Sequence, residues 1–322
     1  MALRIVTTES VPPAADLAFA DLGPITLDDE NDPRILSRAD VLIVRTRAVD
    51  KALLDRTTCL RVIARTGAGL DSIDLAEATK RRLPVIYAPD AGTVPIAEGT
   101  LALIFATTKR LLELGAIVAE GRWQDRYRCD VRDLAGATLG IVGLGRIGSE
   151  VARLAQAVGM HVIAHDPRLA EPGVNGALSS VRRVSLLELV READVVTLHC
   201  ELNDGSRGMI NRDLLVHAKR GAILINASRG GLIAGDDVLR DALDRGWLSA
   251  VGVDVFSSEP PSTTSRLLND PRVISTPHAI GLTRAWNDRV FISLADDIRR
   301  LLEGTRPLFI ANPEVLSALA SS

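Results

Sequence analysis

Short apolar runs alternate with helical patterns along the whole chain. In the first third, five such runs are separated by loops rich in Pro, Asp and Gly. The runs cover Leu3–Val6, Pro24–Leu27, Asp40–Val44, Arg61–Ala64 and Leu83–Tyr87. Because strands that alternate with helices are typical of parallel α/β sheets, the pattern predicts a small five-stranded α/β unit over roughly residues 1–95.

A second series of apolar runs predicts a larger sheet. A helix is expected first, from near Ile96 to about Leu114. The runs then begin at Thr138 and continue through His161–His165, Ala193–Leu198, Gly221–Ile225, Ala250–Val253 and Arg272–Ser275. Six strands with helices between them favour a doubly wound sheet. Another helical pattern follows Gly281.

A glycine-rich turn joins the first of these strands to an amphipathic helix. Gly143 allows a tight turn, Gly145 lets a phosphate approach the backbone, and Gly148 lets the helix pack on the strand. The amides at the start of that helix favour negative charge. The spacing is weak by itself, but in the order strand, glycines, helix, strand it predicts a dinucleotide site rather than an unrelated turn.

Asp166 supports this interpretation because it follows the next predicted strand, 166 − 143 = 23 positions after Gly143. A carboxylate about 20 residues beyond the first glycine binds the adenosine ribose in such domains. The carboxylate would accept a hydrogen bond from a ribose 2′-hydroxyl and would repel a 2′-phosphate. It therefore favours NAD over NADP. The neighbouring Arg168 weakens that preference.

Composition narrows the class of protein further. Hydrophobic residues make up 47% and charged residues 25% of the 322 positions, as in globular proteins. A net charge of −3 and 3% aromatic residues argue against nucleic acid or an anionic membrane as partners. The three cysteines are unpatterned, and neither a signal peptide nor an apolar span is apparent. We expect a cytoplasmic protein of two domains, and we assign no metal site.

Polar side chains follow three of the later strands, at Arg229, Glu259 and His278. Each has an ordinary interpretation: a charge at a helix start, a solvated loop acid, or a capped loop histidine. Ligands of open parallel sheets, however, bind beyond the carboxyl ends of the strands, where all three residues are expected.

Together these groups suit hydride transfer beside a carboxylate. The guanidinium of Arg229 would bind a carboxylate and a carbonyl oxygen. His278 would pass a proton to or from the oxygen at the reacting carbon. Glu259 would hold the ring and favour its protonated form.

Six segments carry a family resemblance: 61–74, 96–98, 143–148, 226–230, 254–260 and 276–278. With them the chain resembles the D-2-hydroxyacid dehydrogenases, within which it is most similar to phosphoglycerate dehydrogenases and hydroxypyruvate/glyoxylate reductases. The resemblance implies an NAD-dependent enzyme that interconverts a small 2-oxo acid and a D-2-hydroxy acid. It implies an α/β fold with two Rossmann-like domains: a doubly wound NAD-binding domain over 99–283 and a smaller flavodoxin-like substrate domain over 1–98 and 284–322, with the active site between them.

The resemblance also assigns roles to single residues. Catalysis falls to Arg229, Glu259 and His278. The cofactor-binding residues would be Gly143, Gly145, Arg146, Ile147, Gly148, Asp166, Cys200, Ala227, Ser228, Asp254 and Gly281, with Cys200 on the adenine side and Ala227, Ser228 and Asp254 at the nicotinamide end. The amides near Ala68 and Gly69, with Arg45 nearby, would bind the substrate carboxylate. A homodimer is expected, with the segment near 100–135 reaching across.

The sequence departs from the family at several places. Gly92 and Pro95 stand before Ile96-Ala97-Glu98, where the family commonly has Asn and Ser, so the usual substrate contacts of that loop change. His199-Cys200-Glu201 replaces a His-x-Pro segment. Arg126 and Arg128 form either a solvated basic loop or a clamp for a phosphorylated or dicarboxylic substrate.

Two other functions are compatible with this fold. A co-repressor-like scaffold that senses NAD(H) can keep the same three residues, although it would need a peptide-binding surface or added tails. Formate oxidation would require Gln in place of Glu259. The sequence leaves open which 2-hydroxy acid is used and the preferred direction.

Overall fold

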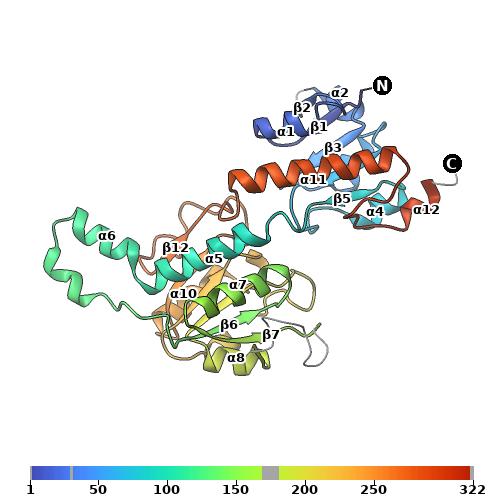
Figure 1. Cartoon of the computed structure of the whole chain (residues 1–322). Helices are drawn as coiled ribbons and strands as arrows, with labels where there is room; N and C mark the ends of the chain where they lie inside the picture. The colour runs from blue at the N-terminus through green and yellow to red at the C-terminus, as the bar shows by residue number, and fades with distance from the viewer. Residues whose placement is uncertain (1, 30–31, 169–180, 320–322) are drawn as a thin grey trace. The chain divides into compact units, whose positions relative to one another are not determined.

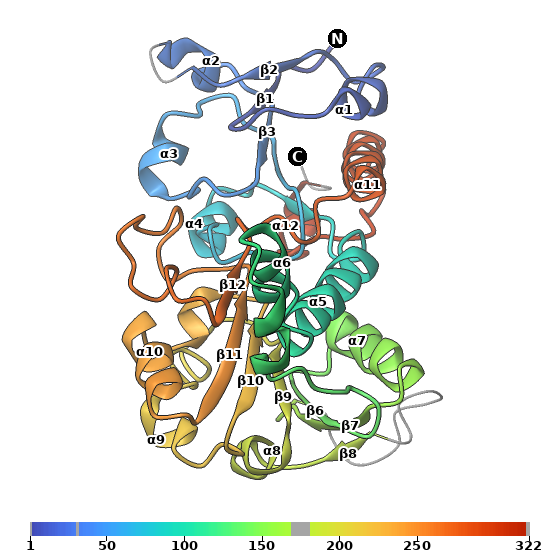
Figure 2. The same ribbon diagram turned by 90° about the vertical axis from the view of Figure 1, so that its left-hand side faces the viewer.

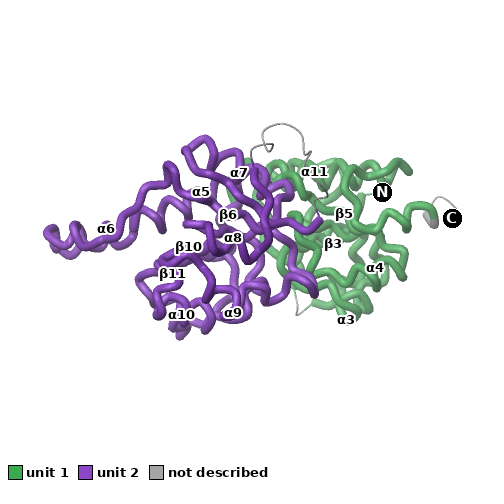
Figure 3. The backbone as a smooth tube through the Cα atoms, turned by 90° about the horizontal axis from the view of Figure 1, so that it is seen from below, with its two compact units in different colours: residues 1–92, 282–322 green, residues 93–281 purple. Residues whose placement is uncertain are grey.

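The computed structural model describes residues 2–29, 32–168 and 181–319. The chain divides into two compact units, one of Met1–Gly92 with Leu282–Ser322 and one of Thr93–Gly281 (Figure 3). The predicted boundaries were 98/99 and 283/284. The first lies inside helix α5 (Thr93–Thr108) and the second directly before α11 (Arg284–Leu302). The chain passes from one unit to the other directly after Gly92, before α5, and directly after Gly281, shortly before α11.

The first unit is built on a five-stranded parallel sheet in the order β2-β1-β3-β4-β5. The strands are β1 (Ile5–Thr7), β2 (Ile25–Leu27), β3 (Val41–Val44), β4 (Val62–Arg65) and β5 (Val85–Tyr87). This confirms the five predicted strands and the flavodoxin-like order. The other helices are α1 (Pro13–Ala18), α2 (Pro33–Ser37), α3 (Lys51–Asp55), α4 (Leu75–Lys80) and α12 (Val315–Leu319).

Helices cover both faces of this sheet because successive strand residues point to opposite sides. Ile5 packs in a cluster with Phe19 and Phe291, which belongs to the face of α1 and α11. Val6, one position later, packs with Leu36 and Leu54 on the opposite face. Figure 2 shows α1 and α11 on one side of the strands and α3 and α4 on the other. Helix α11, which comes from the carboxyl-terminal part of the chain, thus completes the core of the first unit.

The second unit has a seven-stranded sheet in the order β12-β11-β10-β9-β6-β7-β8. Its strands are β6 (Thr138–Val142), β7 (His161–His165), β8 (Arg182–Arg183), β9 (Val195–Leu198), β10 (Ala222–Asn226), β11 (Leu248–Val253) and β12 (Val273–Ser275). All six predicted strands are present, and β8 is an additional edge strand. The strand order reverses between β6 and β9, which is where doubly wound sheets bind ligands.

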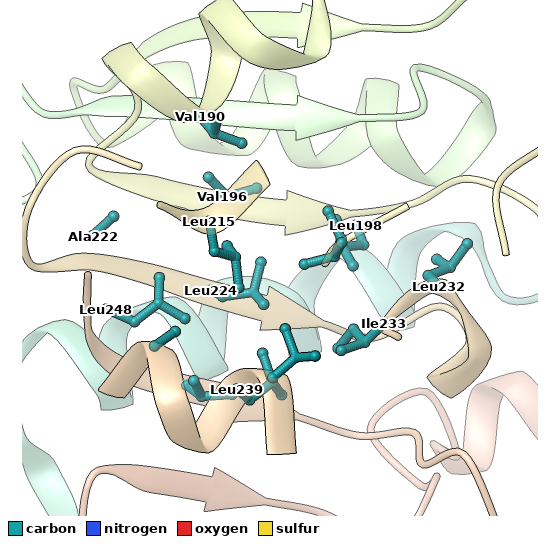
Figure 4. Packing of buried hydrophobic residues seen from close by; sticks show 14 of the residues in the cluster. Val190, Val196, Leu198, Leu215, Ala222, Leu224, Leu232, Ile233, Leu239 and Leu248 are labelled. Carbon is teal, nitrogen blue, oxygen red and sulfur yellow. The ribbon is translucent and has the colours of Figure 1, made fainter. Parts of the chain in front are cut away.

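Two helix layers enclose this second sheet. On one face, α5 and α7 (Arg146–Ala157) bury Ile104 and Val151 against the strands. The other face carries α8 (Leu186–Glu192), α9 (Arg212–Leu215) and α10 (Asp236–Asp244). There Leu224 of β10 packs with Leu215 and Leu239 (Figure 4). These buried faces hold the strand ends in fixed register.

The helix expected from Ile96 to Leu114 is interrupted. It begins at Thr93 and ends at Thr108, and a second helix, α6, covers Leu111–Ala119. Arg110 between them has a left-handed backbone with a φ of 52°, and its guanidinium donates to the Ser249 carbonyl at 3.0 Å. This anchor on β11 coincides with the break. Helix α6 and the 3₁₀ helix η1 (Trp123–Arg128) then project away from the sheet of the second unit (Figure 1).

Among the helices in the described ranges, none combines the length and the apolar character needed to cross a bilayer.

Candidate functional site

The glycine turn lies at the switch point of the second sheet. A Cβ on Gly143, whose φ is 95°, would lie 2.6 Å from the Cys200 amide nitrogen in the loop after β9. A Cβ on Gly148 would lie 2.0 Å from the Gly143 carbonyl oxygen. Any side chain at either position would therefore displace backbone, so these two glycines are required by the loop itself.

Gly145 is different, because nothing lies within 4 Å of the place a Cβ would take. It is the N-cap residue of α7, and Arg146 and Ile147 form the first turn, where amide groups lack helical partners. The residue is exposed, so the open space above it is accessible. An open glycine backbone at a helix N-terminus fits a pyrophosphate.

Asp166 lies at the carboxyl end of β7 and is tied to this turn. Its carboxylate accepts hydrogen bonds from the Leu144 amide at 2.9 Å and the Arg168 amide at 3.0 Å. The Arg168 guanidinium lies 3.1 Å from the carboxylate of Glu201, and both of these side chains are mostly exposed. Asp166 is therefore held where a ribose beside the turn could meet it, and the charge of Arg168 is partly compensated.

Two side chains of the loop after β9, those of His199 and Cys200, form a neutral wall. Burial raises the pKa of the Cys200 thiol to about 11, and the sulfur lies 3.9 Å from that of Met209. Burial also lowers the pKa of His199 to about 4, and the Nε2 atom lies 2.9 Å from the Thr197 hydroxyl. Both groups are uncharged near neutral pH. The Ser228 hydroxyl donates to the Cys200 carbonyl at 2.7 Å and joins this loop to the next.

Asn226 organises the loop that carries Arg229. It is fully buried as the last residue of β10. Its amide donates to the Arg229 carbonyl at 2.9 Å, and its oxygen accepts from the Ser228 amide at 3.1 Å. The Arg229 guanidinium in turn donates to the Ser228 carbonyl at 2.7 Å. Sequence reasoning did not single out Asn226, although an amide at the end of a buried strand is a usable signal.

Glu259 and His278 come from the loops after β11 and β12 and form a direct pair. The Nδ1 atom of His278 lies 2.7 Å from Oε2 of Glu259, whose other oxygen accepts from the Phe256 amide at 3.1 Å. The side chain of His278 is 42% exposed and that of Glu259 is 34% exposed, so solutes can reach both. Because Nδ1 faces the carboxylate, Nε2 lies on the opposite side of the ring.

Asp254 fixes the loop that presents His278. It is 3% exposed, and its carboxylate accepts from the Thr276 hydroxyl at 2.6 Å and from the Ala279 amide at 2.9 Å. Within this loop His278 has a left-handed backbone with a φ of 51°. The observed contacts of Asp254 thus orient the catalytic candidate, while its contact with a nicotinamide stays a prediction.

Gly281 also has an observed structural role. A Cβ there would lie 2.6 Å from the Ile96 side chain of α5, so the glycine permits close packing of the loop on that helix. Pro95 is buried in the first turn of the same helix, where no amide donor is required. The predicted cofactor contact of Gly281 stays a prediction.

The predicted substrate residues lie in the first unit. Arg45 follows β3, and Ala68 and Gly69 follow β4, so all three lie at the carboxyl edge of that sheet. The Arg45 guanidinium lies 5.5 Å from the centre of the Trp286 ring. Gly92, the last residue before the crossing, is buried.

The arginines of η1 make contacts within their own segment. Arg126 stacks between Trp123 and Tyr127, with its guanidinium carbon 5.1 and 4.2 Å from the two ring centres. Arg128 pairs with Asp125 at 3.0 Å. Both arginines thus have partners within η1, and a clamp for a phosphorylated or dicarboxylic substrate stays a prediction.

Residues 101–279 match the family model described as "D-isomer specific 2-hydroxyacid dehydrogenase, NAD binding domain". The chain belongs to this family. It is 34% identical to a chloroplastic D-3-phosphoglycerate dehydrogenase of Arabidopsis thaliana over 98% of this chain and 52% of the relative. It is likewise 34% identical to a hydroxypyruvate reductase of Thermotoga maritima, over 84% and 88% of the two chains.

Solved structures agree with this assignment. A glyoxylate reductase from Paecilomyes thermophila is 25% identical and superposes with a TM-score of 0.85 over 97% of this chain and 99% of that one. The chain spans only about half the length of the curated phosphoglycerate dehydrogenases it matches, between 51% and 58% for the first four.

Proposed function

We propose that the protein is an NAD-dependent oxidoreductase that transfers hydride between nicotinamide and C2 of a small 2-oxo acid or D-2-hydroxy acid. The observation that carries the proposal is the Glu259–His278 pair, joined at 2.7 Å beyond the strands of a sheet whose switch point holds an open glycine turn. Similarity to dehydrogenases and reductases of 2-hydroxy acids supports it.

In the proposed reduction, each side chain has a distinct task. Bound NADH supplies the hydride. Arg229 holds the substrate carboxylate and draws electron density from the C2 carbonyl oxygen. His278 donates a proton from Nε2 to that oxygen, and in the reverse direction it removes the proton from the hydroxyl. Glu259 accepts from Nδ1 and stabilises the charged ring.

We propose a contact for each part of the cofactor, beginning with the pyrophosphate at the glycine turn. The amides of Gly145, Arg146 and Ile147 would bind the pyrophosphate, and Asp166 the adenosine ribose. The neutral wall at Cys200 suits the adenine. Ala227, Ser228, Asp254 and Gly281 remain the proposed contacts of the nicotinamide end. In the first unit, Ala68, Gly69 and Arg45 are proposed to bind the substrate.

An initial-rate screen tests this function. Purified protein should oxidise NADH with at least one of glyoxylate, hydroxypyruvate, pyruvate, oxaloacetate or 3-phosphohydroxypyruvate, and NADPH should be less efficient. Asp166→Asn should narrow the ratio of the kcat/KM values for the two cofactors, because the repulsion of a 2′-phosphate is lost. Failure of every acid with both cofactors would reject the function. A preference for NADPH would reject the role of Asp166.

We also propose that the chain forms a homodimer through α6 and η1. This segment exposes large apolar side chains, among them Leu112 and Val118, each 62% exposed, and Tyr127 at 78%. Exposed apolar side chains gathered on one projecting segment favour an interaction surface. A twofold pairing would bury the same patch on both copies.

The mass in solution tests the dimer. The double variant Leu112→Asp/Val118→Asp should have the monomer mass by light scattering, whereas wild type has twice that mass. Leu17→Asp is the control, because Leu17 is 81% exposed on α1 of the first unit. A monomeric wild type, or a variant that keeps the dimer mass, would contradict the proposal.

A further inference from the structure

The loops that carry Arg229 and Glu259 contact each other at Gly230. A Cβ on Gly230 would lie 2.0 Å from the carbonyl carbon of Phe256, 2.1 Å from its oxygen and 2.4 Å from the nitrogen of Ser257. Non-bonded carbon atoms are normally about 3.5–4.0 Å apart, so only a glycine fits here. The peptide after Phe256 therefore lies directly on the Cα atom of the residue that follows Arg229.

Packing, rather than backbone torsion, requires this glycine. Gly230 begins the 3₁₀ helix η3 (Gly230–Leu232) and does not have the left-handed φ that favours glycine. Its neighbour Gly231 meets only side chains, since a Cβ there would lie 2.9 Å from a methyl carbon of Leu202 and 3.5 Å from the guanidinium of Arg207. Both of these side chains can rotate aside. The two adjacent glycines thus separate a backbone contact from a side-chain contact.

The Arg229 side of the contact is held from several directions. The Asn226 amide group donates to the Arg229 carbonyl at 2.9 Å. Two residues further on, the Gly231 carbonyl accepts from the Gly208 amide at 2.9 Å. Hydrogen bonds therefore fix the backbone on both sides of Gly230, and this loop has little room to move.

The Glu259 side of the contact is fixed at only one end. Phe256 packs against the buried cluster that includes Leu232 and Ile233 (Figure 4). Residues 257–260, which follow it, are all exposed. A side chain added on the glycine would therefore displace the peptide after Phe256 rather than the backbone around Arg229.

This peptide also belongs to the residue that holds the Glu259 carboxylate. The Phe256 amide donates to Oε1 of Glu259 at 3.1 Å, and Oε2 lies 2.7 Å from Nδ1 of His278. Phe256 thus contacts Gly230 through its carbonyl group and Glu259 through its amide. A continuous series of contacts leads from the backbone next to Arg229 to the imidazole ring.

We propose that Gly230 is a positioning residue for the Glu259–His278 pair. By seating the peptide after Phe256, it sets where this pair lies relative to Arg229. The inference rests on the proposed function, in which all three side chains act on one substrate. Misplacement of a reacting group by about 1 Å can cost about 100-fold in rate, so the contact at the glycine controls catalysis without touching the substrate.

Steady-state kinetics of the two glycine variants test this role. Gly230→Ala should lower kcat about 10- to 100-fold with the best 2-oxo acid. NADH affinity should stay close to that of wild type, because the glycine turn after β6 is unchanged. Gly231→Ala is the matched control: it adds the same methyl group to the same short helix, but against side chains that give way, so its kcat should stay near that of wild type.

A double-mutant cycle distinguishes positioning from a general loss of structure. In a Glu259→Ala background, Gly230→Ala should lower kcat by less than about 3-fold, because the side chain that the peptide positions is already absent. A structural defect, or a displaced Arg229, would cost the same factor in both backgrounds. That result would overturn the proposal.

Phe256→Ala approaches the same contact from the other loop and keeps the proposal testable if Gly230→Ala does not fold. It adds no atom near the glycine, but it removes the side chain that anchors the peptide in the buried cluster. Its kcat should fall, and the fall should again disappear in the Glu259→Ala background. A kcat equal to that of wild type would contradict the positioning role.

Amide hydrogen exchange separates this inference from the proposed function, because it needs no turnover. The Phe256 amide should exchange about 2- to 10-fold faster in Gly230→Ala and in Glu259→Ala than in wild type, as expected for the loss of one hydrogen bond. Gly231→Ala should not change it. If no 2-oxo acid is reduced but the exchange responds in this way, the function fails and the contact from Gly230 to Glu259 stands. If reduction occurs and the Phe256 exchange is the same in Gly230→Ala and wild type, the proposal is overturned.

Discussion

At the scale of single residues, buried polar groups hold the loops of the exposed side chains that we propose to be catalytic. Asn226 and Asp254 are almost fully buried at the ends of β10 and β11, where unpaired polar atoms would be costly. Their hydrogen bonds go to the loops that carry Arg229 and His278. The proposed catalytic side chains therefore remain accessible while their backbones are fixed, which is the arrangement that the proposed proton transfer requires.

Glu259→Gln tests the charge of the histidine partner. The amide keeps the size and a hydrogen bond to Nδ1 but no longer stabilises a protonated ring, so kcat should fall about 10- to 1000-fold. Thermal stability and NADH affinity should change little. Glu201→Gln is the control, because Glu201 is an exposed acid that pairs with Arg168. An unchanged kcat for Glu259→Gln would exclude an electrostatic role.

The sequence reveals some of these residues but not their contacts. Arg229, Glu259 and His278 were predicted because polar residues directly after buried strands must share one edge of a parallel sheet. Their hydrogen bonds depend on loop geometry that no periodicity encodes. The contact between Arg45 and Trp286 was not predicted either, because the two residues lie far apart in the sequence and only the fold brings them together.

At the scale of elements, the strands were predictable where burial imposes an apolar run. The exception is β8, in which Arg182 and Arg183 pair with Ile163 and Ala164 at the edge of the sheet. Edge strands need only backbone partners, so two arginines leave no hydrophobic signal. The break between α5 and α6 was also missed, because an apolar pattern continues across Arg110 and does not register its left-handed backbone.

Two glycine substitutions separate folding from binding in the turn after β6. Gly148→Ala should lower stability markedly, because its Cβ would lie 2.0 Å from the Gly143 carbonyl oxygen. Gly145→Ala should fold normally, since nothing lies within 4 Å of its Cβ, but it should weaken NADH binding by filling the space proposed for the pyrophosphate. Urea unfolding and NADH fluorescence titration measure the two effects. Normal NADH affinity in Gly145→Ala would contradict the proposed location of the pyrophosphate.

At the scale of the whole molecule, the first unit is built from both ends of the chain. Asn312 near the carboxyl end accepts from the Val85 amide at 2.9 Å, and α11 supplies Phe291 and Leu294 to the core. Local patterns predict helices and strands but not such distant partners. The assignment of both ends to one domain therefore came from the family resemblance.

The kinetics of His278→Ala test the central claim most directly. With the best 2-oxo acid and saturating NADH, kcat should fall about 10²- to 10⁴-fold, because the proton donor to the C2 oxygen is removed. NADH should still bind with nearly wild-type affinity, since the glycine turn and Asp166 are unchanged. Turnover close to that of wild type, in a variant confirmed to be folded, would contradict the mechanism.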